Sequence, residues 1–158
     1  MDNKNRLFLI SQTYATLFSV TNKLQAIGDE TMKELTSRQV MALIAIVHIP
    51  EGEVTLNAIA SKLGATKQST AQIINNLKKK GYLKSEKSKT DARSVNIVIT
   101  ESGKKVFEEA NEQGWEFLQT SFQAFSIDEL EQLWGLLKKL YQFDGEQQDG
   151  FEAAGREL

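Results

Sequence analysis

The sequence contains no cysteine, one histidine and one proline among its 158 residues. The absence of cysteine excludes thiol redox sensing, iron–sulfur clusters and cysteine-based zinc sites, and it fits a reducing compartment. With one proline and few runs of β-forming residues, helix is expected to dominate. No stretch reaches the roughly 18 uninterrupted apolar residues of a membrane span, and the first residues lack a signal-peptide pattern. We therefore expect a cytoplasmic protein.

Catalytic motifs are likewise missing. The sequence has no G-x-S-x-G nucleophile turn, no Walker loop and no G-x-G-x-x-G dinucleotide motif. The one histidine, His48, ends an apolar stretch, where a favourable contact with the helix dipole accounts for it. With one histidine and no cysteine, only carboxylates remain as metal ligands. We therefore expect no enzyme activity, no catalytic or metal-binding residues and no cofactor.

What the sequence does have is a strong asymmetry of charge. Residues 62–93 hold nine basic and two acidic side chains, a net charge of +7, whereas the remainder, with ten basic and 19 acidic side chains, carries −9. A run of like charge is most often a solvated face. Here the basic third coincides with a predicted helix and hairpin, while both flanks are acidic. This asymmetry favours a polyanion as partner.

Residues 66–81, within this basic third, predict a helix with two distinct faces. Thr66 is a typical N-cap, and Gly81 is typical of the position just beyond a helix end. One face is apolar and consists of Ile73, Ile74 and Leu77. The other carries hydrogen-bonding side chains rather than carboxylates: Lys67, Gln68, Ser69, Gln72 and Asn76. Because such a polar face suits a DNA major groove, we interpret this segment as a recognition helix.

The flanking patterns complete a winged helix-turn-helix. Upstream, Thr55 caps a short amphipathic helix that Gly64 ends, and only Ala65 separates it from the next cap, which is the tight spacing of a helix-turn-helix. Downstream, two β-rich runs surround a polar tip and predict a hairpin. Its inward-facing residues are expected to be Leu83, Val95, Ile97 and Ile99. The expected fold class is mainly α with a small β-hairpin wing.

The terminal regions predict amphipathic helices. Residues 7–27 carry a wide apolar stripe that Gly28 is expected to end. Ser126 and Glu129 form a capping box at the start of the last helix. A third stripe, after Thr100, is expected to face inward through Val106, Phe107, Ala110, Trp115, Leu118 and Phe122. The stripe of the first helix alone fits a broad core face as well as a subunit interface. Together, however, the terminal stripes predict a two-fold homodimer.

These patterns divide the chain into three parts. Residues 1–28 and 101–143 are expected to form a helical dimerisation region, and residues 32–100 a winged helix-turn-helix DNA-binding domain. Within that domain, Thr36 and Gln39 have capping-box spacing and precede an apolar run that is expected to be central and buried. Residues 144–158 are acidic and glycine-spaced, so we expect a flexible tail.

The order of these elements and two motifs resemble the multiple-antibiotic-resistance regulator (MarR) family. The motifs are LNAIASKLGATKQSTAQIINNLKKKGYL and TDARSVNIVITESG, and the resemblance covers residues 7–141. In the second motif, Asp91-x-Arg93 is similar to the family's wing-tip D-x-R, and Thr100-Glu101-x-Gly103 to the start of its fifth helix. Family members are dimeric DNA-binding regulators, and many release DNA on binding a small, often aromatic, anion.

The resemblance implies roles for particular residues. Arg93 would enter the minor groove, with Asp91 orienting it. Base edges or nearby phosphates would be approached by Thr66, Lys67, Gln68, Ser69 and Gln72. A ligand pocket between the dimer helices and the winged helix would have Tyr14, Phe18 and Trp115 in its walls, although a plain core or interface position accounts better for any one of these three taken alone.

Gln72 departs from the family pattern, since many relatives have arginine there. An amide pairs well with adenine, whereas arginine prefers guanine, so an A·T-rich operator is favoured, and Arg93 in a narrow minor groove agrees with this. Phosphate contacts are expected from Lys78, Lys79, Lys80, Lys84, Lys87 and Lys89. The alternative function is a winged helix that contacts an acidic protein. The uncharged polar row of the recognition helix argues against it, because such a partner requires charge and not base-edge donors. We expect a repressor.

Overall fold

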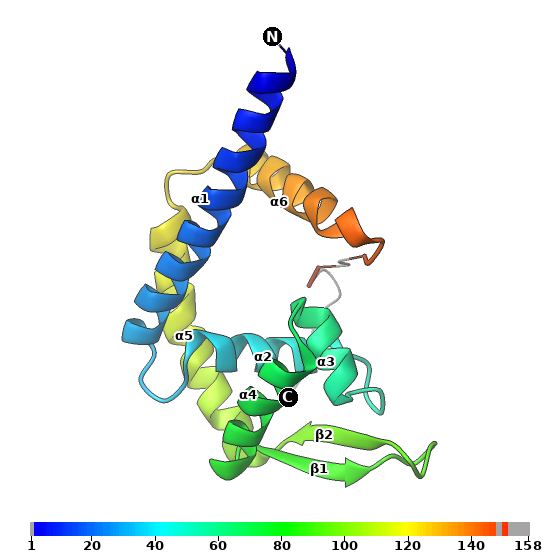
Figure 1. The fold of residues 1–158 in the computed structure, drawn as a ribbon. Coiled ribbons are helices and arrows are strands. Elements are labelled where there is room, and N and C mark those ends of the chain that lie inside the picture. The colour runs from blue at the N-terminus through cyan, green and yellow to red at the C-terminus, as the bar shows by residue number, and fades with distance from the viewer. Residues whose placement is uncertain (1, 148–149, 152–158) are drawn as a thin grey trace.

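The computed structural model describes residues 2–147, 150 and 151. The described helices are α1 (Asp2–Thr31), α2 (Ser37–His48), α3 (Leu56–Leu63), α4 (Lys67–Lys79), α5 (Glu101–Phe122) and α6 (Ile127–Tyr141), followed by a 3₁₀ turn, η1 (Gln142–Asp144). Strands β1 (Leu83–Lys87) and β2 (Val95–Ile99) form an antiparallel hairpin between α4 and α5. In Figure 1, α2, α3, α4 and the hairpin form one end of the molecule, and α1 and α6 lie toward the other. The expected fold class is confirmed.

Side-chain caps begin five of these helices at the positions that the sequence predicts. Thr36 and Gln39 form a capping box at α2, with hydrogen bonds of 3.3 and 3.0 Å, and Ser126 and Glu129 form another at α6, with bonds of 3.2 and 2.9 Å. Three further hydroxyls each accept a 3.1 Å hydrogen bond from the amide three residues on, and they belong to Thr55, Thr66 and Thr100. Each cap stabilises its helix by about 1 kcal/mol, because it satisfies an amide that has no partner within the helix.

The hydrophobic core lies in the winged helix and takes in the first half of α5. Helix α2 is central to it, as expected, and the side chains buried most completely are Leu43, Ile46, Val54, Ile59, Ile74 and Leu77. The hairpin adds Leu83, Ile97 and Ile99 to this core. The Ile97 amide donates to the Val54 carbonyl at 2.8 Å, which ties the second strand to the segment before α3. The wing is therefore fixed to the helix-turn-helix at its base.

Two of the sequence-based expectations are wrong within these elements. Val95 does not face inward but is 52% exposed, because it pairs with Lys87 at the turn end of the hairpin, beyond the core. Gly28 does not end the first helix, since α1 continues to Thr31. Gly28 is buried, and a Cβ there would collide with the Ser37 hydroxyl oxygen. Glycine is needed at this position for the close approach of α1 and α2.

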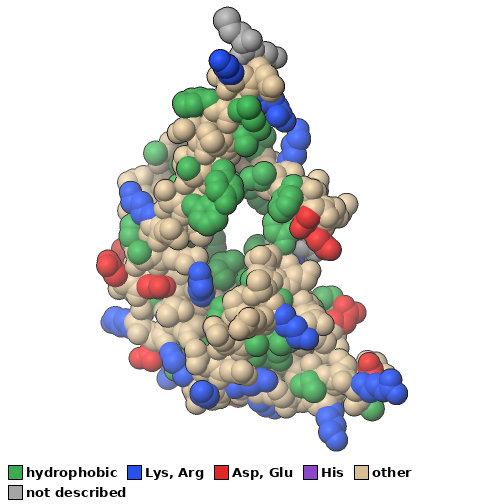
Figure 2. Space-filling model, viewed as in Figure 1, with side chains coloured by type: hydrophobic (Ala, Val, Ile, Leu, Met, Phe, Trp, Pro, Cys, Tyr) green, Lys and Arg blue, Asp and Glu red, His purple; other side chains and the backbone are tan. Residues whose placement is uncertain are grey.

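Most of the apolar stripe on α1, and all of that on α6, lies outside the core. The inward orientation expected along α5 holds for Val106, Phe107 and Ala110 but not for Trp115 and Leu118, which are 62% and 42% exposed. None of the described residues of α6 is buried. Figure 2 shows hydrophobic side chains around a hollow between α1, α6 and the winged helix. The sequence pattern identified the apolar faces of α1, α5 and α6, but it did not show which part of the protein or which partner buries them.

The expected tail, residues 144–158, is described only in part. Positions 148–149 and 152–158 lie outside the described residues. Asp144 belongs to η1, whereas Gly150 is buried and the Phe151 ring lies against His48. Among the helices that the structure describes, none has the length and apolar character to cross a membrane.

Candidate nucleic-acid interface

Helix α4 is packed on one side and open on the other. Thr70, Ile74 and Leu77 are buried against the core. Gln68, Gln72 and Asn76 are exposed, and their spacing of four residues places them in one row along the helix. The row offers amide donors and acceptors, which is the chemistry that base edges in a major groove require.

The first turn of α4 is held by a compact hydroxyl network. The Thr66 hydroxyl accepts from the Ser69 amide at 3.1 Å and donates to Ser69 Oγ at 3.0 Å, while Ser69 Oγ donates to the Thr66 carbonyl at 3.1 Å. Each hydroxyl oxygen keeps one free lone pair. Thr66 is therefore the cap of α4 and Ser69 its partner, and either hydroxyl can contribute to DNA contact only as a hydrogen-bond acceptor. Lys67, beside them, is exposed.

The turn between α3 and α4 is short because Gly64 adopts a left-handed conformation. Its φ is +60°, and the Ala65 amide donates to the Ala60 carbonyl at 2.9 Å. Such a C-cap closes α3 and lets the chain reach Thr66, the N-cap of α4, two residues later. The two helices are thereby joined by the tight turn of a helix-turn-helix.

The tip of the wing is ordered by its own polar side chains. The Asp91 carboxylate accepts from the Arg93 backbone amide at 2.9 Å, and the Ser88 hydroxyl accepts from the amides of Thr90 and Asp91 at 3.3 and 3.2 Å. A backbone bond of 3.0 Å from Ser88 to Ser94 closes the loop. Asp91 thus orients Arg93 through its backbone, and the Arg93 side chain lies exposed at the tip.

The lysines expected at phosphates are not equivalent. Lys80 Nζ donates to the Glu34 carbonyl at 2.9 Å, so this side chain joins the end of α4 to the segment before α2. Lys84 forms an exposed ion pair of 2.8 Å with Glu86, on the same strand. The hydrogen bond from Lys84, its charge and the charge of Lys89 lower the pKa of Glu86. Lys87 and Lys89 are exposed on the wing, as Figure 2 shows for the basic side chains at this end of the molecule.

The Lys80 contact was not foreseeable, because its partner is a backbone oxygen 46 positions away in the sequence. The Lys84 pair was foreseeable. Residues two apart in a strand lie on the same face, so Lys84 and Glu86 are neighbours once the strand is assigned. Both contacts reduce the set of lysines available to a phosphate backbone.

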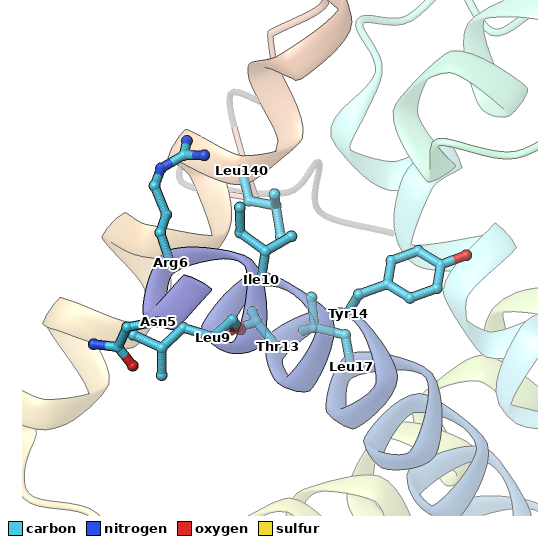
Figure 3. Close-up of a pocket in the computed structure, with 8 residues that line it drawn as sticks. All are labelled: Asn5, Arg6, Leu9, Ile10, Thr13, Tyr14, Leu17 and Leu140. Carbon is cyan, nitrogen blue, oxygen red and sulfur yellow. Dashed lines mark hydrogen bonds between the residues drawn. The ribbon is translucent and has the colours of Figure 1, made fainter. Parts of the chain in front are cut away.

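The aromatic residues assigned to a ligand pocket lie on the terminal helices. A groove of about 480 Å³ is lined by Asn5, Arg6, Leu9, Ile10, Thr13, Tyr14, Leu17 and Leu140 (Figure 3). Tyr14 is in this wall, and its ring centroid is 5.0 Å from that of Phe18. Phe18 and Trp115 are exposed but are not among the residues that line the groove. The three aromatic residues thus do not share one cavity in the single chain.

Taken together, a helix held by one face, a tight preceding turn and a hairpin with a basic tip define a winged helix-turn-helix protein. Residues 33–94 match the sequence model of the MarR family. The uncharacterised HTH-type transcriptional regulator YfiV of Bacillus subtilis is 32% identical over 105 residues, 65% of each chain. The transcriptional repressor MprA of Escherichia coli is 26% identical over 111 residues, which cover 70% of this chain and 63% of that protein. The chain thus spans just under two thirds of these curated relatives.

A solved structure extends the similarity to the terminal helices. The S. aureus MepR–DNA complex superposes with a TM-score of 0.70 and 26% sequence identity, over 80% of this chain and 95% of that one. The chain is thus similar to the MarR family in the sequence of residues 33–94 and in its overall fold. The resemblance stated from the sequence is confirmed.

Proposed function

We propose that the chain is a sequence-specific, double-stranded DNA-binding transcriptional regulator that acts as a homodimer. The observation that carries the proposal is the exposed amide row Gln68, Gln72 and Asn76 on a helix whose other face is buried. The packing of α4 against the core is important, because a helix reads base edges only if its side chains reach them in a fixed register. The exposed Arg93 at the wing tip and the wing lysines supply positive charge beside that helix. The MepR structure, determined with DNA, supports this reading.

The homodimer follows from the exposed apolar faces of the terminal helices. On α1 these include Leu7, Ile10, Tyr14 and Phe18, and on α6 they include Leu130, Trp134, Leu137 and Leu140. Burying about six such side chains per subunit is worth on the order of 9–18 kcal/mol before the costs of association. The groove that α1 forms with Leu140 is open and mainly apolar, which suits a helix from a second copy. A two-fold arrangement would bury the same faces on both chains.

The regulatory direction that we propose is repression in the cytoplasm, with release from DNA by a small aromatic ligand. Repression is the activity named for the relative MprA. Tyr14, Phe18 and Trp115 are exposed aromatic side chains on α1 and α5, and a second subunit would bring further walls to them. An aromatic carboxylate or a phenol suits such surroundings. The aromatic side chains can stack on the ring of the ligand, and the Tyr14 hydroxyl can form a hydrogen bond with its carboxylate or hydroxyl group.

Selection of bound duplexes from a random pool tests the proposed function. Because a two-fold dimer presents two recognition helices, the selected sites should contain an inverted repeat. Its half-sites should lie about 10 base pairs apart, or at a multiple of that spacing. A·T base pairs should be enriched where Gln72 and Arg93 make contact. If the bound duplexes show no common sequence and binding weakens as the salt concentration rises, the protein is a general polyanion binder. Absence of duplex binding would favour the winged helix as a protein-contact module.

A further inference from the structure

The end of α6 contacts the first helix of the helix-turn-helix. The Tyr141 hydroxyl donates to the Ser61 carbonyl at 3.1 Å. The Tyr141 ring packs against Gly64, where a Cβ would lie 3.0 Å from two of its atoms. The Ser61 carbonyl lies in the last turn of α3 and also accepts from the Gly64 amide at 3.1 Å, so Tyr141 supplies its second donor. A residue of the terminal helices therefore contacts the C-terminal turn of α3.

Nine residues further along the chain, a second contact reaches the same helix. Lys62 Nζ donates to the Gly150 carbonyl at 2.7 Å and lies 5.1 Å from the centroid of the Phe151 ring. That ring also meets His48, at the end of α2, edge to face with 5.2 Å between centroids. Phe151 thus bridges the ends of α2 and α3 through a cation–π and an aromatic contact.

The opposite junction between the terminal helices and the winged helix is more extensive. There the Asp29 carboxylate accepts from the Ser37 amide at 2.6 Å, and the Ser37 hydroxyl donates to the Gln25 carbonyl at 3.2 Å. Buried Gly28 lets α1 and α2 approach closely, and α5 packs on α2 through the core. In Figure 1, α6 descends toward α3 on the side away from this junction. The winged helix is thus held firmly at one end and by a few contacts at the other.

We propose that Tyr141 and Phe151 form a tether that fixes the orientation of the helix-turn-helix relative to α6. In the homodimer proposed above, on which the functional part of this inference rests, α6 belongs to the interface. The tether then sets the separation of the two recognition helices and hence the half-site spacing that the dimer accepts. Tyr141 and Phe151 are positioning residues, since they lie away from the polar row of α4 and act through α3.

The free protein provides the first test, without DNA. Because the chain has no cysteine, spin labels at Asn57→Cys on α3 and Gln132→Cys on α6 are unique, and both positions are exposed. Dilution with a large excess of unlabelled chain leaves only the pair within one subunit. Phe151→Ala and Tyr141→Phe should broaden the distance distribution. They should also speed amide exchange at the end of α3 about 2- to 10-fold, the change in opening equilibrium expected for one lost hydrogen bond in Tyr141→Phe or for the lost ring contacts in Phe151→Ala.

Phe143→Ala is the matched control, because Phe143 lies in the same segment but is 85% exposed. It should leave both measurements unchanged. If Phe151→Ala and Tyr141→Phe also leave them unchanged, no tether exists.

The second test measures binding to operator duplexes with half-sites at the selected spacing or with two base pairs inserted or removed. The two tether variants should bind the selected spacing several-fold more weakly and should discriminate less among the spacings. If the variants discriminate among the spacings as well as the wild type does, or bind the selected spacing more tightly, the assigned role is wrong. If wild-type protein binds no duplex, the proposed function fails, whereas the label distances still decide whether the tether exists.

Discussion

Gly103 offers a sharp test of how the wing is joined to α5. The residue is buried in the first turn of α5, and its amide donates to the Thr100 hydroxyl at 3.1 Å. A Cβ at Gly103 would collide with the Tyr82 carbonyl oxygen and lie 2.9 Å from Ile99 Cγ2. The same Tyr82 oxygen accepts from the Thr100 amide at 3.0 Å. Space, rather than backbone conformation, therefore requires glycine here.

Gly103→Ala should lower the free energy of unfolding by about 1–3 kcal/mol. Overpacking against a backbone oxygen costs about 1–3 kcal/mol, and weakening the hydrogen bond that this oxygen accepts costs about 1 kcal/mol more. Alanine returns about 1 kcal/mol, because its intrinsic helix propensity is higher. For a chain of this size the net loss corresponds to a fall in Tm of about 2–10 °C.

Urea denaturation followed by circular dichroism measures this loss, at one fixed protein concentration because association changes apparent stability. Gly135→Ala is the control: no neighbouring atom lies within 4 Å of a Cβ at that position in α6. It should gain up to about 1 kcal/mol from helix propensity. A Gly103→Ala variant as stable as the wild type would refute the close packing of α5 against the start of the hairpin.

Three further outcomes follow from the structure. Arg93→Ala should weaken operator binding and reduce the preference for flanking A·T pairs, because an exposed guanidinium is lost from the wing tip; unchanged affinity in a gel-shift titration would remove the wing from the interface. Light scattering at micromolar concentration should give twice the chain mass, and a monomer would contradict the α1–α6 interface. The Ser126 amide and hydroxyl lower the pKa of Glu129, so the α6 cap stabilises above the ordinary carboxyl pKa and is lost as pH falls through the lowered value. Carboxyl NMR titration should show a Glu129 pKa below that of an ordinary glutamate, and an unshifted pKa would contradict the capping box.

Local chemistry made the helix starts and the winged helix predictable from sequence. A threonine or serine followed three residues later by glutamine or glutamate specifies its own hydrogen bonds, so Thr36 and Ser126 were correctly assigned. Gly28 was misassigned, because glycine marks both helix ends and close helix contacts, and only Ser37 across the junction decides between them.

Long-range contacts were outside the reach of sequence patterns. The apolar stripe that includes Trp115 shows which face of α5 avoids water, yet its 62% exposure in one chain depends on which partner covers it. Lys80 and Lys62 looked like solvent-exposed charges, but each donates to a distant backbone carbonyl. Residues beyond the family resemblance, such as Phe151, gave no signal of their contacts with α2 and α3.

The central claim is that α4 reads base sequence, and fluorescence anisotropy on selected and scrambled duplexes at two salt concentrations tests it most directly. Gln72→Ala should cost roughly 1–3 kcal/mol on the selected site and leave scrambled DNA unaffected, because one bidentate amide–adenine pair is lost. Lys87→Ala, the control for phosphate contact, should weaken both duplexes alike and lower the salt slope by about one unit. Equal losses on both duplexes for Gln72→Ala would contradict base reading by this helix.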